Sequence, residues 1–332
     1  MKAWAIETYG DNSVVRMMDL PKPQPREDEV LIQVKAASVN PLDFKIRSGQ
    51  LKSVMSVRFP FILGQDCAGV VTAVGSRVSK FEVGDEVYTR PPQESMGTLA
   101  EFVAVKESAL AKKPENISFE EAAGIPLVGL TSWQVLVNRA KIKKGQKVFI
   151  AAGSGGVGSF AIQLAKSFGA YVIANTSTKN VAFVKNLGAD EVIDYKTQDF
   201  SQCVSDIDIF FDTMGDETQA KAFAVLKRGG VLASIVGPPT ASFAREAGLG
   251  LPVQLGAGLL GLPTTLKAAL RSVRYIYHVM HPDGEALERI SQLIEEGSIR
   301  PVVDRVYKFE NANDAVAHVE SGRVRGKVIV SV

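Results

Sequence analysis

The pattern of apolar and polar positions changes character near residue 120 of the chain. Before that point, short β-branched runs between Gly, Pro and Asp breakers predict strands at 30–39, 68–74, 85–89 and 99–105. After it, apolar runs alternate with helical stripes, which predicts strands at 148–151, 171–174, 191–193, 208–212 and 230–236 and helices at 157–168, 179–187 and 218–226. Such alternation predicts a parallel sheet with helices on both faces. Towards the end we expect a helix after Pro282, a strand at 302–309, a helix at 312–319 and a strand at 328–332.

A glycine-rich turn stands between the first of these later strands and its helix. The apolar run 148–151 leads into the sequence Gly-Ser-Gly-Gly-Val-Gly at 153–158, and a helical stripe follows. Glycines let the backbone approach a pyrophosphate, and the N–H groups and dipole of a helix N-terminus favour its charge. The alternative is a tight turn without a ligand, but the strand before it and the helix after it favour a dinucleotide. We therefore predict cofactor contacts at Ser154, Gly155, Gly156 and Val157.

The segment after the second of these strands favours NADPH over NADH. An acidic residue about 20 positions beyond the glycines would bind the 2′-hydroxyl of NAD. The stretch 175–180 contains no Asp or Glu, and offers Ser177, Lys179 and Asn180 instead. A hydroxyl and a cation suit a 2′-phosphate, which a carboxylate would repel. Ser177 and Lys179 would equally serve as the cap and a surface charge of the next helix, and both roles are compatible with NADPH.

Composition narrows the classes of function. At 332 residues the chain has room for about two domains. Its net charge of +2, without a basic patch, makes a nucleic-acid partner unexpected. Two cysteines argue against a disulfide framework and suit a reducing compartment. No membrane partner is expected, because the apolar stretch 248–262 is interrupted and too short to span a bilayer. The N-terminus lacks the apolar core of a signal peptide, so we expect a cytoplasmic protein.

Further distinctive stretches are SVNPLD at 38–43, GQDCAG at 64–69, VGDEV at 83–87, GTLAEF at 97–102, GLTSW at 129–133, LGADEVIDY at 187–195 and GKVI at 326–329. Together with the glycine turn, they resemble the medium-chain dehydrogenase/reductase superfamily, and most closely its zinc-free quinone and enone oxidoreductase branch. The resemblance implies an α/β protein with a GroES-like β-rich catalytic domain at 1–121 and 283–332 and an inserted Rossmann domain, a doubly wound parallel sheet, at 122–282. It also implies a homodimer joined through Rossmann-sheet edges near 274–280.

Departures from the zinc-dependent relatives predict a protein without metal. Those relatives carry Cys where Asn40 stands, and Gly-His-Glu where residues 64–66 read Gly-Gln-Asp. A catalytic zinc needs about three protein ligands from Cys, His and carboxylates, and the histidines of this chain occur only at 278, 281 and 318. Without a Lewis acid, alcohol oxidation has little to stabilise its alkoxide. Hydride addition to a quinone or an enone spreads the charge into a phenolate or enolate, which a few donors can stabilise. We therefore predict NADPH-dependent reduction of a quinone or an activated C=C bond.

The resemblance also assigns residues to the catalytic cleft. Asn40 would lie near the nicotinamide and bond the cofactor or the substrate oxygen, or it would simply be a turn residue before Pro41. Asp43 and Asp66 would border the same cleft. Asp66 would act as a general acid only if burial raised its pKa, and we favour an ionised structural carboxylate. No tyrosine occurs at 45–60 to serve as a proton donor, so water or a ribose hydroxyl remains open as the source.

More cofactor contacts follow from the same resemblance, each with a structural alternative. Thr131 would lie near the nicotinamide or pack its own helix, and Tyr195 would bind the 2′-phosphate or end a strand. Val236 and Gly237 would offer backbone groups to the nicotinamide amide. Gly326 and Lys327 would form a turn that reaches the cofactor, unless Lys327 is a solvated charge. An apolar substrate pocket, or ordinary core, is predicted from Leu51, Val54, Met55, Phe59, Phe243 and Leu262.

Two other functions stay open at this point. An enoyl-thioester or 2-haloacrylate reductase would use basic residues near the cleft, unless these are merely a solvated face; the candidates are Lys45, Arg47, Lys52 and Arg58. A non-catalytic NADPH-binding protein of the crystallin type, or an RNA-binding protein, belongs to another class, and turnover with any acceptor would separate it from the enzymes.

Overall fold

The computed structural model describes residues 1–52, 55 and 57–332, and divides them into two compact units. Unit 1 comprises Met1–Leu130 and His281–Val332, and unit 2 comprises Thr131–Met280. One expected pocket residue, Val54, lies outside the described residues. The domain boundaries drawn from the sequence, at 121/122 and 282/283, stay predictions.

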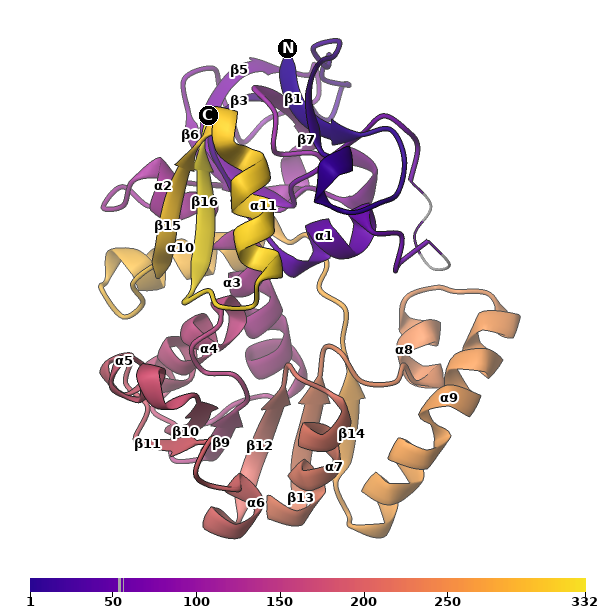
Figure 1. The fold of residues 1–332 in the computed structure, drawn as a ribbon, viewed down its shortest axis with the longest axis vertical. Coiled ribbons are helices and arrows are strands. Elements are labelled where there is room, and N and C mark those ends of the chain that lie inside the picture. The colour runs from indigo at the N-terminus through magenta and orange to yellow at the C-terminus, as the bar shows by residue number, and fades with distance from the viewer. Residues whose placement is uncertain (53–54, 56) are drawn as a thin grey trace. The chain divides into compact units, whose positions relative to one another are not determined.

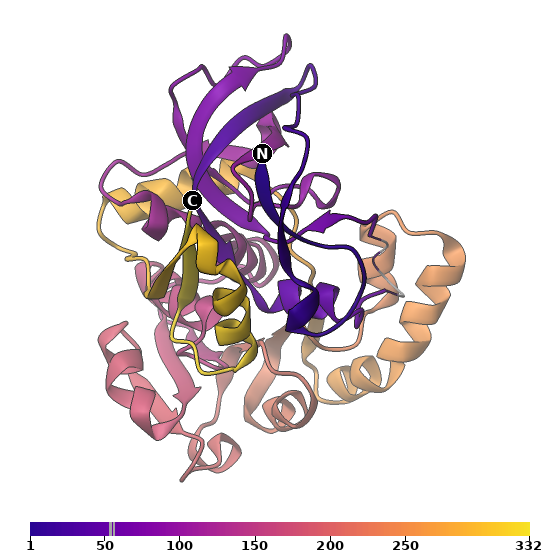
Figure 2. The same ribbon diagram turned by 45° about the horizontal axis from the view of Figure 1, so that its top comes forward.

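Unit 1 is built around a seven-stranded sheet. Its order is β15 (Val303–Lys308), β16 (Lys327–Ser331), β3 (Glu29–Val39), β5 (Asp66–Val74), β6 (Glu86–Thr89) and β8 (Leu110–Lys112), and β7 (Phe102–Lys106) also pairs with β3. A smaller sheet contains β2 (Arg16–Asp19), β1 (Lys2–Ile6) and β4 (Phe61–Ile62). The helices are α1 (Pro41–Arg47), α2 (Phe119–Ala123), α10 (Gly284–Glu295) and α11 (Ala312–Glu320), while α3 (Pro126–Trp133) crosses the boundary between the units. Helix α11 lies along β16 (Figures 1 and 2).

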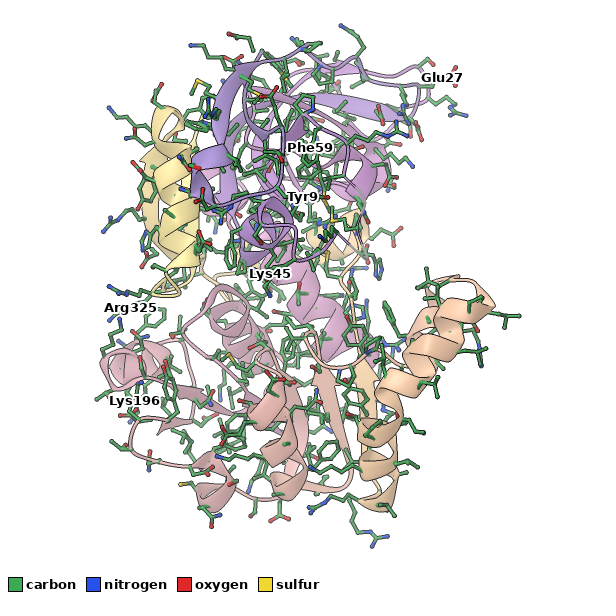
Figure 3. The ribbon with its side chains drawn as sticks, turned by 45° about the vertical axis from the view of Figure 1, so that its right-hand side comes forward. Tyr9, Glu27, Lys45, Phe59, Lys196 and Arg325 are labelled. Atoms are coloured by element: carbon green, nitrogen blue, oxygen red, sulfur yellow. The ribbon has the colours of Figure 1, made fainter. Side chains whose placement is uncertain are left out.

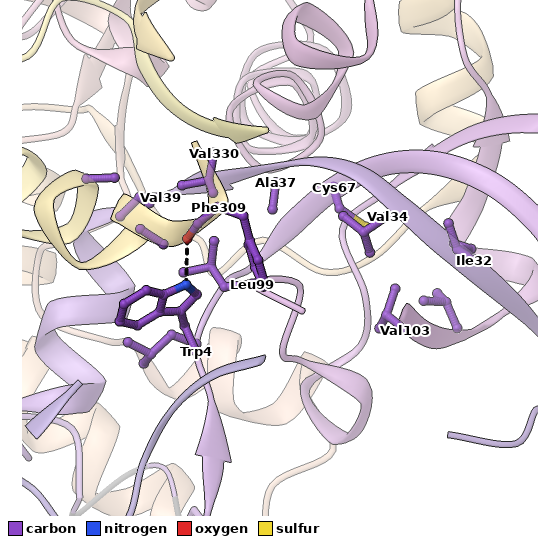
Figure 4. Packing of buried hydrophobic residues seen from close by; sticks show 14 of the residues in the cluster. Trp4, Ile32, Val34, Ala37, Val39, Cys67, Leu99, Val103, Phe309 and Val330 are labelled. Carbon is purple, nitrogen blue, oxygen red and sulfur yellow. Dashed lines mark hydrogen bonds between the residues drawn. The ribbon is translucent and has the colours of Figure 1, made fainter. Parts of the chain in front are cut away.

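The core of unit 1 joins segments from both ends of the chain. Trp4 donates from its indole nitrogen to the carbonyl oxygen of Phe309 at 2.7 Å, as Figure 4 shows. Trp4 and Phe309 belong to one buried cluster with Val30, Ile32, Val34 and Val39 of β3, which is why the N-terminal strand and the C-terminal segment form one unit. Burial of this apolar surface is the main force that holds the unit together.

Unit 2 is a parallel sheet of six strands. Their order is β11 (Glu191–Asp194), β10 (Tyr171–Thr176), β9 (Lys147–Ile150), β12 (Ile207–Asp212), β13 (Leu226–Ser234) and β14 (Arg274–Tyr277), which is the dinucleotide-binding order 3-2-1-4-5-6. The helices are α4 (Gly156–Ser167), α5 (Val181–Asn186), α6 (Phe200–Cys203), α7 (Asp216–Val225), α8 (Ala241–Glu246) and α9 (Leu251–Leu270). The sheet and its helices occupy the lower half of Figure 1. In the core, the rings of Phe149 and Phe210 stack with centroids 4.5 Å apart.

The predicted fold class is confirmed, and among the elements that differ from expectation are the strand before Lys106 and the segment that follows β13. The strand expected at 99–105 begins at Phe102, because Leu99 instead bonds through its backbone to Trp4 and Leu63. No helix was expected between 237 and 281, yet α8 and the 20-residue helix α9 fill most of that stretch. Pro263 lies inside α9 and Pro252 in its first turn, where a missing N–H costs nothing. No helix among the described residues is long and apolar enough to cross a membrane.

Candidate active site

Strand register creates a buried polar network in unit 1. In the antiparallel pairing of β3, Ser38 lies opposite Asp66 of β5, and Val39 lies opposite Val328 of β16. Asn40, which follows β3, and Lys327, which begins β16, therefore come together although they are far apart in sequence. We call the following residues the polar network, all of them buried: Ser38, Asn40, Asp43, Gln65, Asp66, Arg90 and Lys327.

Asp66 is the acceptor at the centre of the polar network. Its Oδ1 accepts hydrogen bonds from the Ser38 hydroxyl and, at 2.8 Å, from Asn40 Nδ2. Its Oδ2 accepts from the Leu127 backbone N–H at 3.1 Å and lies 3.9 Å from Lys327 Nζ. These contacts favour the structural role expected for Asp66 over the general acid.

Lys327 is buried, so the expectation that it might be a solvated charge is wrong. Only 6% of the residue is exposed, and Nζ donates to Asn40 Oδ1. Burial lowers the pKa of Lys327, while the carboxylates of Asp66 and Asp43 oppose that shift. Asn40 is thereby held at both ends of its amide, since its Nδ2 also donates to Asp66 and, at 3.3 Å, to Ser38 Oγ. Its backbone also caps α1 before Pro41, as the turn alternative expected.

Asp43 is fully buried in the first turn of α1. It accepts from the backbone N–H of Asn40 at 2.7 Å and of Gly64 at 2.9 Å, and from Gln65 Nε2 at 3.3 Å. Burial raises the pKa of Asp43 to about 6, although these donors hold it lower than burial alone would. Asp43 therefore changes protonation close to neutral pH.

Arg90 completes the polar network, and the sequence reasoning missed it. Its Nη2 donates to Gln65 Oε1 at 3.3 Å, and its Nη1 donates to the carbonyl oxygen of Pro91. Its Nε, also buried, has no hydrogen-bond partner among the described residues. Burial lowers the pKa of Arg90, against the attraction of Asp66 and Asp43. A signal was available in the sequence, since Arg90 directly follows the strand predicted at 85–89.

The glycine turn of unit 2 has the form expected of a cofactor corner. Helix α4 begins after Gly155, and the first N–H groups of a helix lack acceptors within it. A Cβ at Gly158 would lie 2.2 Å from the carbonyl oxygen of Ala152, so no other residue fits there. At Gly155 the nearest atom to such a Cβ is 3.5 Å away, which leaves the turn open to a ligand. Asn175, a positioning residue that sequence reasoning missed, accepts from the Ala152 N–H at 2.8 Å and pins the turn to β10.

The residues assigned to the 2′-phosphate gather at the end of β10. Asn180 Nδ2 donates to Ser154 Oγ at 3.0 Å and to Ser177 Oγ at 3.3 Å, so the glycine turn and the following segment meet. Thr176 joins them through Ser154 Oγ at 3.0 Å. Lys179 is exposed on the short helix that Ser177 precedes. The hydrogen bonds of Asn180 thus bring Ser154 and Ser177 together with it, and all three residues are predicted to contact the cofactor.

The other predicted cofactor residues lie at several places in their units. Tyr195 is half-exposed after β11, with Lys196 (labelled in Figure 3) 5.3 Å from its ring centroid. Thr131 is buried at the start of unit 2. Val236 is exposed beyond β13, and Gly237 follows it where a Cβ would lie 2.2 Å from Gln219 Nε2. Gly326, in unit 1, has a φ of 70° and backs onto Val302, which explains a glycine there without a ligand.

Comparisons with known proteins agree with this architecture. The alcohol dehydrogenase GroES-like domain matches residues 26–115, and the zinc-binding dehydrogenase domain matches residues 187–330. The mouse NAD(P)H oxidoreductase RTN4IP1, mitochondrial, is 36% identical over all of this chain and 89% of its own length. The chloroplastic NADPH-dependent alkenal/one oxidoreductase of Arabidopsis thaliana is 35% identical over 99% of this chain and 79% of its own. A quinone oxidoreductase from Coxiella burnetii superposes with a TM-score of 0.85 at 31% identity, covering 100% and 99% of the two chains.

The chain belongs to the medium-chain dehydrogenase/reductase superfamily. Within it, the chain falls in the quinone and enone oxidoreductase branch, and it is an oxidoreductase.

The zinc in the name of one matched family does not fit the residues of this superfamily member. At the positions where zinc-dependent relatives hold ligands, the Asn40 amide and the Asp66 carboxylate are engaged with the Lys327 ammonium. A zinc ion there would face a buried cation. The described residues contain no group of three or more His, Cys, Asp or Glu able to hold a metal.

One of the basic residues considered for an anionic substrate, Arg47, is buried and belongs to an ion pair. Arg47 is 2% exposed and binds both carboxylate oxygens of Glu320, at 2.8 and 3.1 Å. It joins α1 to α11 and is neither a cleft-mouth charge nor part of a solvated face.

Phe59, expected in the pocket, meets the ring of Tyr9 edge-on with centroids 5.1 Å apart, and Figure 3 labels both.

Proposed function

We propose that this oxidoreductase is an NADPH-dependent, metal-independent reductase that transfers hydride to a quinone or to the activated C=C bond of an α,β-unsaturated carbonyl. The observation that carries the proposal is the Lys327 ammonium, buried between Asn40 and Asp66 in the polar network. Two buried cations, Lys327 and Arg90, accompany two buried carboxyls, Asp43 and Asp66, so the polar network holds positive charge without a metal.

The cofactor corner of unit 2 supports the cofactor part of the proposal. The open turn at Gly155 and the N-terminus of α4 would hold the pyrophosphate, and Ser177, Lys179 and Asn180 would hold the 2′-phosphate. NADPH supplies the hydride when bound. The similarity to a relative named as NADPH-dependent adds weight to this choice over NADH.

The polar network supports a conjugated acceptor. When hydride adds to such an acceptor, negative charge moves to its carbonyl oxygen, and fixed cations and donors stabilise that charge most effectively in a dry site. Lys327 and Arg90 are such groups, and their low exposure means that little water screens them. Asp66 holds the Lys327 ammonium in place, and the lowered pKa of Lys327 eases release of its proton to a developing enolate.

The test of the reaction measures NADPH oxidation by chelator-treated protein with a short enone, a quinone, a crotonyl thioester and a 2-haloacrylate, and NMR identifies the products. We expect turnover of the enone or the quinone, with the enone yielding its saturated ketone. Preference for the thioester or haloacrylate would transfer the protein to that class of reductase. Tight NADPH binding without turnover of any acceptor would favour the non-catalytic NADPH-binding protein, and loss of activity with chelator would refute metal independence.

The test of the cofactor compares NADPH and NADH on matched variants. We expect Ser177→Ala with Lys179→Ala to raise KM for NADPH roughly tenfold, as befits lost charge-assisted bonds, and to leave KM for NADH unchanged. Lys185→Ala on α5 removes an exposed cation from the same unit and should change neither. Equal losses with both cofactors would show that the pair does not recognise the 2′-phosphate.

A further inference from the structure

A buried carboxylate lies where two neighbouring strands of unit 2 end. Asp212 ends β12 and Ser234 ends β13, and the two residues are register partners in the parallel pairing of these strands (Figure 1). Both are fully buried. On the other side of β12, strand β9 leads into the glycine turn, and Thr213 Oγ1 donates to the carbonyl oxygen of Ala151 at 3.0 Å. Asp212 and Ser234 therefore lie at the same edge of the sheet as the cofactor corner.

Asp212 accepts four hydrogen bonds. Its Oδ1 accepts from the backbone N–H groups of Met214 at 3.0 Å and Gly215 at 2.8 Å. Its Oδ2 accepts from Gln219 Nε2 at 3.2 Å and from the Ser234 hydroxyl at 2.8 Å. Two carboxylate oxygens offer about four lone pairs, so these donors occupy the carboxylate completely. Gly215 also caps α7, and the dipole at the N-terminus of that helix favours the negative charge of Asp212.

Ser234 links this carboxylate to the segment that follows β13. Its hydroxyl donates to Asp212, and its oxygen accepts from the backbone N–H groups of Val236 at 3.3 Å and Gly237 at 2.8 Å. The N–H of Ile235 donates to the carbonyl oxygen of Asp212 at 3.2 Å. The two residues after Gly237 are prolines, which have no N–H. Within this described segment, no backbone N–H therefore remains for a ligand.

The same segment offers carbonyl oxygens instead. Those of Ile235, Val236 and Gly237 accept no hydrogen bond from the residues that the structure describes, whereas the carbonyl oxygen of Pro238 accepts from Tyr275 Oη at 2.9 Å. Val236 is 45% exposed, so a ligand can reach the segment. A Cβ at Gly237 would lie 2.5 Å from Tyr275 Oη, so the backbone lies directly against the side chains that hold it. The segment thus presents acceptors in a fixed position.

We propose that Asp212 and Ser234 are positioning residues that determine which group the protein accepts at the nicotinamide end of the cofactor. This inference rests on the proposed function and on the predicted contact of Val236 and Gly237 with the nicotinamide amide. Because Ser234 holds the N–H groups of the segment, only carbonyl oxygens are left to meet the carboxamide, and they accept from its NH₂ group but repel another oxygen. Asp212 acts through Ser234, because it takes the hydroxyl proton and leaves the oxygen to accept from the segment.

The experiment measures, by isothermal titration calorimetry, how tightly the full chain binds NADP⁺ analogues that differ only at the 3-position of the pyridine ring. The thionicotinamide analogue keeps the NH₂ group, and the 3-acetylpyridine analogue has a methyl group in its place. We expect the wild type to bind the first about tenfold more tightly than the second, as befits one lost hydrogen bond. Ser234→Ala releases the N–H groups of Val236 and Gly237, which can then donate to the acetyl oxygen, so this ratio should fall to about twofold.

A second variant reaches the same segment without removing the serine. In Asp212→Asn the amide oxygen is required by the N–H groups of Met214 and Gly215, so the amide nitrogen faces Ser234 and donates to its oxygen. That nitrogen competes with the N–H groups of the segment, and the ratio should fall here as well. A matched control, Ser291→Ala, removes a buried hydroxyl of unit 1 and should keep the wild-type ratio. Circular dichroism and the melting temperature show that each variant is folded.

The outcomes separate this inference from the proposed function. A wild-type ratio in both Ser234→Ala and Asp212→Asn would overturn the inference, and so would a wild type that binds the two analogues equally. If the wild type nevertheless binds 2′,5′-ADP, which is the adenosine end of NADPH, the proposed cofactor stands while the role of Asp212 and Ser234 is refuted. A wild type that binds neither NADP⁺ nor 2′,5′-ADP would refute both.

Discussion

Lys327→Met tests whether the buried cation holds the polar network together. The substitution keeps the length and apolar stem of the side chain but removes the charge that faces Asp66 Oδ2 at 3.9 Å. At an effective dielectric constant near 20, two unit charges at that distance attract by about 4 kcal/mol. Asp66 keeps its bonds from Ser38, Asn40 and the Leu127 N–H, which offset part of the loss. We therefore expect unit 1 to lose about 3 kcal/mol of unfolding free energy, as when one partner of a buried pair is removed.

The assay follows unit 1 alone. The chain has two tryptophans, Trp4 in unit 1 and Trp133 in unit 2, so a Trp133→Phe background leaves Trp4 as the reporter. Its buried indole bonded to Phe309 should change fluorescence when the core of unit 1 opens in urea. Reading one unit avoids treating a protein of two units as a single two-state transition.

A double-mutant cycle separates the ion pair from other effects of the substitutions. We expect Asp66→Asn and Lys327→Met to be non-additive, with a coupling of about 2 kcal/mol or more. As a surface control, Lys106→Met breaks the exposed pair with Glu94 and should cost less than about 1 kcal/mol. Additive single effects, or a Lys327→Met variant as stable as the control, would refute the argument that this cation compensates a buried carboxylate.

Three further predictions concern protonation, the glycine turn and the thiols. The pKa of Asp43 is raised to about 6, so its contribution to stability is fully present below the ordinary value of 3.8 and is lost as pH rises through about 6. The free energy of unfolding measured in urea should therefore fall by about 3 kcal/mol over this pH range. This pH dependence should be absent in Asp43→Asn, and its persistence in that variant would contradict the prediction. Gly158→Ala should abolish NADPH binding in a fluorescence titration while Gly155→Ala is tolerated far better, because only the first meets an atom at 2.2 Å; equal effects would contradict this. Iodoacetamide should label exposed Cys203 but not Cys67, whose thiol pKa burial raises, and mass spectrometry would expose the error if both reacted before unfolding.

The cofactor corner and the fold class of unit 2 were readable from sequence. The reason is that the signal is local: β9, the glycine turn and α4 follow one another along the chain, and each has its own periodicity or composition. The absence of an acid at 175–180 can be read directly from the sequence. The clustering of Ser154, Ser177 and Asn180 could be expected as well, because neighbouring strands of a parallel sheet end at the same edge. The assignment of these residues to NADPH stays a prediction.

Helix α9 shows where periodicity alone misleads. Its glycines and prolines have low helix propensity, so the stretch reads as an irregular apolar run. The contact of Gly261 with the segment before α8 fixes which side of the helix is buried. Only the tertiary structure could show that the small residues face inward and the leucines outward, since an apolar position in sequence does not say what it packs against.

The polar network is the part of the site that tertiary structure decided. The sequence by itself determined that Asn40 and Asp66 stand where zinc-dependent relatives hold ligands, and left Lys327 open as a surface charge. Its burial between them follows from the pairing of β3 with both β5 and β16. Strand pairing joins residues almost 300 positions apart, such as Asn40 and Lys327, through backbone hydrogen bonds that nearly any sequence can make. Local patterns in the sequence therefore predicted the cofactor corner. Long-range strand register determined the charge environment in which we propose that the chemistry takes place.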